Sequence, residues 1–345
     1  MKNLKYDYVV GTGGIGGGVL FRFFDDTTLG RNESRLAELM DTKDFCKLHI
    51  ILHYIAVYME NELPIYAIGR VGNDSNGEEA LSLMKKYGIN CSHVSVDPKA
   101  KTMYSVCFVY PNSDGGNITS QNSASGNVSV EDVEYFFEKE DVRGRGLVLA
   151  APEVALEVRE ALLQKGRERG CFNVASFASE EMAECVELGI LDNVDLLAIN
   201  EHEMEALLHV LELEYDNPYQ ECYEYLKSRN PKMRLIITLG GEGAFLFENG
   251  SGERVPAIWK PVNSTAGAGD CFLATVISGL LCGIPLLENG EKVGLGGLAS
   301  LASSIKVTCK DTIDFSLNRK KLYQEKEKLG IEFSEKINRL FWRKS

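Results

Sequence analysis

Short apolar segments alternate with longer segments of mixed character along most of the chain. Apolar runs of strand length occur at residues 8–10, 64–68, 147–151, 171–175, 194–199 and 235–239. Between several of these runs the apolar residues are spaced as on one face of a helix, for example in residues 154–165. Strands that alternate with helices are typical of a parallel sheet with helices on both faces. The pattern therefore predicts a three-layer α/β fold with a central, mostly parallel sheet, in one domain that spans residues 1–345.

Two further segments are almost entirely apolar and of helical length. Residues 47–56 and 271–281 have few polar positions, which predicts helices that are buried on all sides. The apolar character around the second segment extends over fewer than the roughly 20 residues that a membrane span requires. It also contains Gly283 and Pro285. We therefore expect a core helix here and no membrane partner.

Two amphipathic patterns predict helices with an exposed face. Leu36, Leu39 and Met40 have the spacing of one helical face, directly after a polar loop. Residues 322–343 are amphipathic and rich in charge, which predicts a surface helix near the end of the chain.

The composition narrows the class of partner. The 345 residues are 44% hydrophobic and 25% charged, as in a soluble globular protein, and the net charge is −13. An excess of acidic residues argues against a nucleic-acid-binding surface, which requires clustered Lys and Arg. The nine cysteines are scattered and form no C-x-x-C pair, which is typical of reduced thiols in a cytoplasm. We expect a cytoplasmic protein that acts on a small-molecule substrate.

The turn at residues 264–270 carries the clearest chemical signal. Small residues, among them Gly267 and Gly269, lead straight into an apolar segment, which predicts a tight turn at the start of a buried helix. The backbone N–H groups of Gly267, Ala268 and Gly269 are then suited to bind an anion. Asp270 is an acid within this turn. A natural role for it is to take a proton from a hydroxyl group that attacks a bound phosphoryl group.

An amide and a carboxylate stand together after another predicted strand. Asn200 and Glu203 are three residues apart and follow the apolar run 194–199. Oxygen atoms at the carboxyl end of a parallel strand suit Mg²⁺ and its water molecules. A helix-capping box would explain part of the same pattern. The pair therefore predicts a magnesium site beside the anion-binding turn.

Two other patterns have competing explanations. Residues 11–16 satisfy G-x-G-x-x-G, but the segment that follows has the character of a strand and not of the helix that a dinucleotide-binding turn requires. His49 and His53 are four residues apart, as in zinc-binding helices. No Glu lies between them in the required position and no third ligand is evident, so a zinc site is not expected.

The sequence Thr265-Ala266-Gly267-Ala268-Gly269-Asp270 resembles the signature Asp-Thr-x-Gly-Ala-Gly-Asp of the PfkB (ribokinase-like) carbohydrate kinases. Asn200-x-x-Glu203 matches the Asn-x-x-Glu motif of that family, and residues 238–243 resemble its Thr-x-Gly-x-x-Gly segment. The resemblance covers roughly residues 6–312, with these motifs in the family's order.

The resemblance implies an ATP-dependent kinase that phosphorylates a hydroxyl group of a small sugar or sugar-like molecule. It implies that Asp270 is the catalytic base, that the amides of residues 267–269 form an anion hole, and that Mg²⁺ lies near Asn200 and Glu203. ATP would contact a set of small and hydroxyl-bearing residues: Thr238, Gly240, Gly243 and Thr265. A helix at 293–305 would border the adenine. The family also implies a small β-lid over the acceptor, formed by segments of about 14–37 and 101–121, and a homodimer through that lid.

The acceptor side departs from the family pattern. Glycine stands where the family usually has an Asp after the first strand, and residues 47–53 replace its usual Gly-Gly and Asn. Arg31 near the lid, together with Lys47 and His53, are the candidate substrate-binding residues in this region. Ser264 also replaces the first Asp of the signature.

Several functions remain open on the sequence alone. The acceptor is a sugar, sugar acid, polyol, nucleoside or sugar phosphate, and an anionic acceptor is one hypothesis because of the arginines at 22, 31 and 35. A ligand-binding or regulatory protein that kept the fold without catalysis is the alternative from another class. A nucleotide-dependent oxidoreductase is the third.

Overall fold

The computed structural model describes residues 4–112, 114–142, 144–212, 216–288 and 290–342. Within these ranges a nine-stranded sheet runs through the molecule in the order β13-β12-β11-β10-β9-β8-β1-β4-β5. Neighbouring strands from β11 to β5 are parallel, and β12 and β13 form an antiparallel edge. Its strands are β1 (Tyr8–Thr12), β4 (Ile65–Gly72), β5 (Ile89–Asp97), β8 (Gly146–Ala150), β9 (Phe172–Ala175), β10 (Leu196–Asn200), β11 (Arg234–Thr238), β12 (Ala244–Glu248) and β13 (Ser251–Val255).

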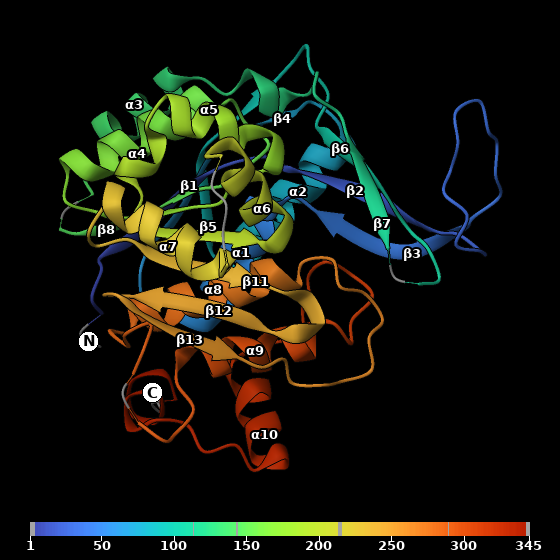
Figure 1. The fold of residues 1–345 in the computed structure, drawn as a ribbon. Coiled ribbons are helices and arrows are strands. Elements are labelled where there is room, and N and C mark those ends of the chain that lie inside the picture. Colours follow the sequence, from blue (N-terminus) through green and yellow to red (C-terminus); the bar gives the residue numbers. More distant parts are fainter. Residues whose placement is uncertain (1–3, 113, 143, 213–215, 289, 343–345) are drawn as a thin grey trace.

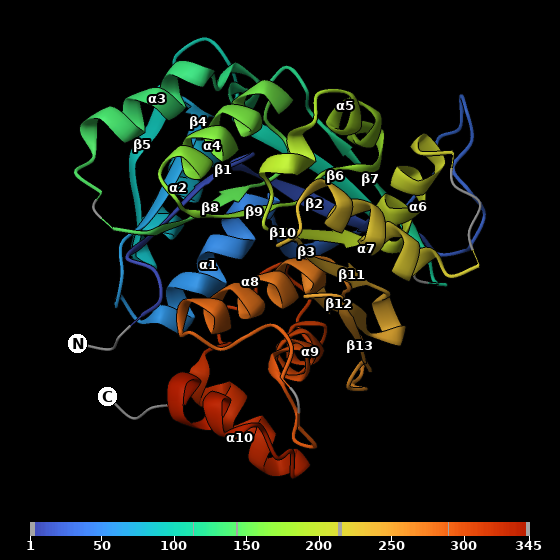
Figure 2. The same ribbon diagram turned by 60° about the vertical axis from the view of Figure 1, so that its left-hand side comes forward.

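Helices cover both faces of this sheet (Figures 1 and 2). One face carries α3 (Val130–Lys139), α4 (Leu156–Glu168), α5 (Met182–Glu187), α6 (Glu201–Val210) and α7 (Pro218–Arg229). The other packs against α1 (Lys47–Met59), α2 (Ser75–Lys86), α8 (Ala268–Leu281) and α9 (Leu295–Lys306), with α10 (Arg319–Leu329) beyond them. Side chains of the buried strands alternate between the two cores: Val9 enters one, whereas Tyr8 and Val10 enter the other. The predicted three-layer α/β fold is confirmed.

The two apolar segments form the helices expected of them. In α1 and α8 almost every residue is buried, and the two helices pack against each other beneath the sheet. Such uniformly apolar helices are stable only where neighbours cover them all round. None of the helices within the described ranges combines the length and apolar character that a membrane crossing requires.

A second, four-stranded sheet lies to one side of the main sheet (Figure 1). It consists of β2 (Gly16–Arg22), β3 (Glu38–Phe45), β6 (Met103–Val109) and β7 (Gly115–Thr119), in the order β3-β2-β6-β7 within the described residues. We call this sheet, with the loop between β2 and β3, the lid. Strands β2, β6 and β7 lie within the segments of about 14–37 and 101–121 that were expected to form a lid, whereas β3 follows the first segment. Ser113 lies outside the described residues.

The helix predicted through Leu36, Leu39 and Met40 is wrong. Residues 38–45 form β3, which pairs antiparallel with β2. Leu36 and Leu39 are exposed, so the apolar spacing does not mark a buried helical face.

The tail is also not one surface helix. Helix α10 ends at Leu329, where Gly330 adopts a left-handed conformation with φ 64°. The chain then folds back into a short π-helical turn at Ile337–Phe341, and Phe333, Ile337 and Phe341 are fully buried. The apolar residues that suggested a helical stripe therefore belong to the core, while Arg343 lies outside the described residues.

Candidate active site at the start of helix α8

The turn before α8 has a backbone that only glycine accommodates at one position. Gly267 has φ 77°, and a Cβ atom built there would lie 2.3 Å from the backbone oxygen of Thr312. Thr312 is itself tied to the end of β3, because its side-chain hydroxyl accepts a hydrogen bond from the backbone N–H of Phe45. The turn is thus held between the start of α8 and the base of the lid.

The amides of the turn are only partly available for an anion. The N–H of Ala268 donates to the carbonyl of Thr265 at 3.0 Å. Within the described residues, those of Gly267 and Gly269 have no acceptor. These two amides stand at the positive end of the α8 dipole, where an anion is favoured.

Asp270 is paired with Lys47, the first residue of α1. The Lys47 Nζ lies 3.7 Å from a carboxylate oxygen of Asp270 and donates to the hydroxyl of Ser176 at 3.1 Å. Burial raises the pKa of Asp270, although Lys47 and Lys306 oppose this. Burial alone would lower the pKa of Lys47, but the attraction of nearby carboxylates raises it. The result is a basic carboxylate beside a fixed cation.

Two further carboxyl groups lie close to this pair and were not recognised in the sequence. Burial raises the pKa of Glu153 to about 7, and it also raises the pKa of Asp44; in both cases the charge on Asp270 adds to the effect. Glu153 has φ 76°, and one of its carboxylate oxygens is buried without a hydrogen-bond partner among the described residues. A Cβ atom at Gly14 would lie 2.5 Å from that oxygen, so Glu153 fills the space above the glycine.

The glycine after the first strand thus has a structural explanation. The carboxylate of Glu153, which comes from the loop after β8, occupies the space that a side chain at Gly14 would need. No local sequence pattern links these two residues, since they meet only through the pairing of β1 with β8.

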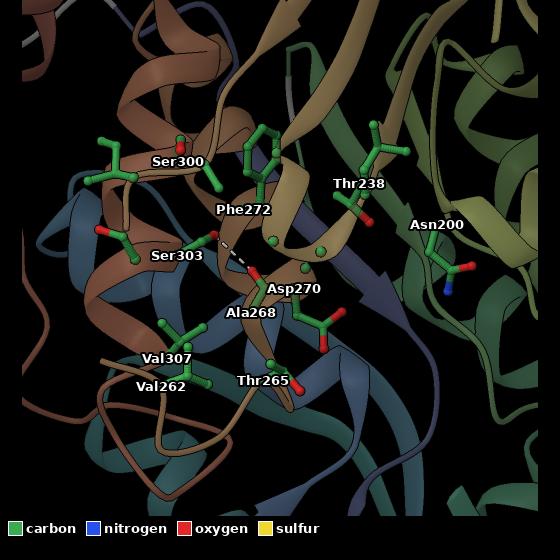
Figure 3. A pocket seen from close by; sticks show the side chains of 18 of the residues that line it. Asn200, Thr238, Val262, Thr265, Ala268, Asp270, Phe272, Ser300, Ser303 and Val307 are labelled. Carbon is green, nitrogen blue, oxygen red and sulfur yellow. Dashed lines mark hydrogen bonds between the residues drawn. The ribbon is translucent and has the colours of Figure 1, made fainter. Parts of the chain in front are cut away.

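Asp270 and Lys47 also line a cavity of about 650 Å³ (Figure 3). Most of the predicted site residues line it: Lys47, Asn200, Thr238, Gly240, Gly243, Thr265, Ala268, Gly269 and Asp270. Asn200 and Thr238 end the neighbouring parallel strands β10 and β11, so the fold brings them to the start of α8. Gly267 and Glu203 are not among the lining residues.

The rest of the lining was mostly missed from the sequence. Helix α9 contributes Ser300, Ser303 and Ser304 and was expected to border the base of a nucleotide. Figure 3 shows that Ser303 reaches the first turn of α8, where its hydroxyl donates to the carbonyl of Ala268 at 2.9 Å. Phe272 and Trp259 add apolar surface, and Trp259 is 84% exposed. Backbone and hydroxyl groups that suit phosphate therefore line the same cavity as an apolar wall.

Asn200 and Glu203 form a capping box at the start of α6. The Asn200 side-chain oxygen accepts from the Glu203 N–H at 2.9 Å, and the Glu203 carboxylate accepts from the Asn200 N–H at 2.8 Å. In the described part of the chain, no three His, Cys, Asp or Glu side chains are grouped to hold a metal. Carboxylate and amide oxygens with spare lone pairs fit Mg²⁺ that keeps several waters and binds substrate phosphates.

His53 and Arg31 do not line this cavity. His53 is fully buried in α1 against the rings of Tyr54, Tyr87 and Phe315, so it has no route to a substrate. Because nearly every residue of α1 is buried, the side chain of His53 packs in the core. Arg31 is exposed in the lid loop between β2 and β3.

The other arginines offered for an anionic acceptor are placed similarly. Arg35 forms ion pairs with Glu33 and Asp25 of the same loop, and Arg22 is exposed. The positive charge beside Asp270 comes instead from Lys47 and Lys306.

Comparison with known proteins places these features in a family. The model of the pfkB family carbohydrate kinases matches residues 59–319. The chain is 28% identical over 213 residues to a ribokinase of Lactococcus lactis, which covers 62% of this chain and 65% of that protein. It is 28% identical over 227 residues to a 2-dehydro-3-deoxygluconokinase of Thermoproteus tenax, with 62% and 67% covered. The alignment with the first relative thus spans a little less than two thirds of that protein's length.

Solved structures share the fold at low sequence identity. A ribokinase from Cryptococcus neoformans in complex with ADP superimposes with a TM-score of 0.73 at 16% identity, over 92% of this chain and 99% of that one. A nucleoside kinase from Burkholderia thailandensis in complex with inosine gives a TM-score of 0.71 at 15% identity, over 94% and 99%.

Proposed function

Since the chain belongs to the pfkB family of carbohydrate kinases, we propose that it transfers the γ-phosphoryl group of ATP to a hydroxyl group of a small sugar or sugar-like molecule. One observation carries the proposal. Asp270, whose side chain is 14% exposed and lies 3.7 Å from the Lys47 Nζ, stands beside unbonded amides at the start of α8 and at the wall of a cavity of about 650 Å³.

In this proposal Asp270 removes the proton of the acceptor hydroxyl. The hydroxyl oxygen then bonds to the γ-phosphorus, and the bond from phosphorus to the leaving oxygen of ADP breaks. Negative charge on the transferred group is stabilised by the amides of Gly267 and Gly269 and by Lys47. The raised pKa of Asp270 favours this role, because a more basic carboxylate accepts a proton more readily.

ATP occupies the cavity lined by Thr238, Gly240 and Gly243. Bare glycines there let the backbone approach the phosphates, and the apolar wall formed with α9 suits the base. Asn200 and Glu203 would hold Mg²⁺ through its water molecules. The ion, when bound, would neutralise phosphate charge.

The acceptor is a neutral, polyhydroxylated molecule rather than an anion. Asp44 and Glu153 both lie near Asp270, so carboxyl groups outnumber the one lysine, Lys47, that pairs with Asp270. A second anion in that place would be repelled, whereas carboxylates accept hydrogen bonds from hydroxyl groups. A nucleoside or a free sugar meets this description better than a sugar phosphate or sugar acid.

The proposal also includes a cellular compartment and an oligomeric state. The nine cysteines are all free thiols and most are buried, which supports a reducing, cytoplasmic compartment. Large apolar side chains are exposed on the lid, which supports a homodimer formed through it.

The test is ADP release from Mg-ATP across a panel of sugars, polyols, nucleosides, sugar acids and sugar phosphates. We expect turnover with a neutral acceptor. Asp270→Asn should keep ATP binding and lose at least 10³-fold in kcat. Turnover retained by Asp270→Asn would contradict the assignment of the base. If ATP binds but no compound of the panel is turned over, the result would favour a ligand-binding protein that kept the fold.

A further inference from the structure

Lys306, the last residue of α9, is a buried cation that the proposed reaction has not used. The residue is 0% exposed, and its Nζ donates to the backbone carbonyl of Ser264 at 3.2 Å. Among the described residues no carboxylate lies within 4.0 Å of this ammonium group. A buried charge without a close counterion is costly, so packing alone does not account for it.

The ammonium group completes a set of ties between α9 and the turn. The backbone N–H groups of Asn263 and Ser264 donate to the carbonyl of Val307 at 2.7 and 3.2 Å. The Lys306 Nζ then donates to the carbonyl of Ser264, which belongs to the next peptide unit. The backbone N–H and the backbone carbonyl of Ser264 are therefore both bound by the end of α9, three residues before Gly267.

The charge of Lys306 also acts on the catalytic carboxylate. The groups that face it are Asp270 and Cys271 on α8, and Cys309 and Asp314 in the segment after α9. Burial lowers the pKa of Lys306, against the attraction of these four groups. Conversely, Lys306 is one of two cations that pull the pKa of Asp270 down.

Ser264 matters to this arrangement because it is uncharged. A carboxylate at this position, as in the family signature, would neutralise a neighbouring ammonium group. With Ser264 in its place, the positive charge of Lys306 acts on Asp270 and on the anion-binding turn without that competitor.

We infer that Lys306 is a positioning residue for phosphoryl transfer: its buried ammonium group fixes the turn through Ser264 and holds a positive charge behind Asp270. It touches neither substrate, and the inference rests on the proposed kinase function. Its effect is therefore expected on the chemical step more than on the binding of ATP or acceptor.

The first test is Lys306→Met, with Lys292→Met as the matched control on the segment that leads into α9. Lys292 is exposed and pairs only weakly with Glu332 at 3.7 Å. Lys306→Met should lower kcat at least tenfold, change both KM values less than threefold, and move the acidic limb of the kcat profile to higher pH. The thermal midpoint should stay constant or rise, because an apolar side chain replaces a buried charge. Lys292→Met should match the wild type.

Two further variants separate charge from shape. Lys306→Gln keeps a donor for the Ser264 carbonyl without the charge and should also lose activity. Lys306→Ala leaves space for a small cation, and methylammonium should restore part of its kcat, whereas tetramethylammonium should not. If Lys306→Met fails to fold, these two variants still test whether the positive charge of Lys306 is required for activity.

Binding of MgADP with aluminium fluoride, a mimic of the transferred phosphoryl group, provides a readout without turnover. Lys306→Met should weaken this binding at least tenfold and leave MgADP alone within threefold. Unchanged affinity for the mimic, or unchanged kcat, would overturn the inference. Absence of turnover in the wild type with every acceptor would instead overturn the proposed function, and the mimic would still decide the role of Lys306.

Discussion

At the scale of single residues, Gly267 and Gly269 show how two glycines of one turn serve different purposes. Gly267 has a left-handed backbone and no room for a side chain beside Thr312. Gly269 lies in the first turn of α8, and a Cβ atom there would meet only the Thr238 hydroxyl oxygen, at 3.9 Å. The first glycine is required by the fold and the second by the space that it leaves in the cavity.

Alanine substitution should therefore separate stability from activity. Gly267→Ala should lower the free energy of unfolding by about 2 kcal/mol or more, because strain and a steric clash combine. Gly269→Ala should keep or raise the free energy of unfolding, by up to about 1 kcal/mol, since Ala favours helix. It should nevertheless lower kcat at least tenfold. Urea unfolding and ADP release measure the two quantities.

Each glycine is the control for the other. An active Gly269→Ala protein would mean that the transferred phosphoryl group does not bind at this turn. A Gly267→Ala protein of full stability would contradict the constraint set by Thr312.

At the scale of elements, helix α1 combines one charged residue at the candidate site with an apolar body. Lys47 at its first position faces Asp270, while His49 and His53 are fully buried one turn apart. None of the four ring nitrogens of these histidines has a hydrogen-bond partner in the described part of the chain. Burial lowers the pKa of each histidine to about 3.

The two histidines should make folding sensitive to acid. Below pH 6.5 the unfolded chain binds protons that the folded protein excludes, so stability falls as the pH drops toward 3. The variant His53→Phe keeps an aromatic ring and removes one such group. Relative to the wild type, it should gain roughly 1 kcal/mol of unfolding free energy for each pH unit between 6 and 4.

Wild type and His53→Phe must be compared because other groups change the free energy of unfolding in the opposite direction. Carboxyl groups with raised pKa values, such as Glu153 and Asp270, gain stability in the same pH range, so the slope of the wild type is a sum. Equal pH dependence of wild type and His53→Phe in urea unfolding would show that His53 is protonated in the folded protein.

The segment between β13 and α8 carries the most exposed aromatic residue of the cavity. Trp259 is one of two tryptophans in the chain and lines the cavity, whereas Trp342 packs against Tyr323, Phe333 and Phe341. An exposed indole beside a nucleotide gains contact area when the base binds.

Binding of MgADP should therefore change the intrinsic fluorescence. The change should persist in Trp342→Phe and vanish in Trp259→Phe. Trp259→Ala should weaken MgADP binding by about 1 kcal/mol, or roughly fivefold, as expected for the loss of one stacking contact. A fluorescence change that survives in Trp259→Phe would place the base away from this segment.

At the scale of the whole molecule, the residues predicted to bind ATP and the phosphoryl group mostly line one cavity, whereas two of the three predicted to bind the acceptor do not. Asn200, Thr238 and the turn at 264–270 are local motifs whose spacing along the chain sets their geometry, since each follows a strand or opens a helix. Glu153 and Lys306 act through contacts between distant segments, and no periodicity or motif marks them. His53 was misplaced although the apolar run at residues 47–56 predicts a helix that is buried on all sides, and only Lys47 at the first position of α1 reaches the cavity.

Helical spacing also failed where few apolar residues were available to define it. The helical pattern rested on only three residues, of which Leu36 lies before β3, and Leu39 and Met40 lie within it. In the tail, Gly330 interrupts a pattern that otherwise continues into buried residues. In both places the sheet or the core outweighed local preference.

The exposed apolar side chains of the lid lead to the last prediction. Leu36 is 86% exposed and Ile118 68%, and Phe24 and Leu39 of the same lid are also mostly exposed. Large apolar groups exposed on one part of a surface are typical of a protein–protein contact. A two-fold contact of this kind would bury the same surface on both copies and cover the open edge of β3 or β7.

Sedimentation velocity should therefore give twice the chain mass of 38.2 kDa at micromolar concentration. The double substitution Leu36→Glu with Ile118→Glu should produce a monomer of unchanged thermal midpoint. Leu188→Glu alters a half-exposed leucine outside the lid, so that variant should remain dimeric. A wild type that is monomeric at every concentration would contradict the dimer. If the monomeric variant also binds its acceptor more weakly while keeping its affinity for MgADP, then contact between two copies steadies the lid over the acceptor.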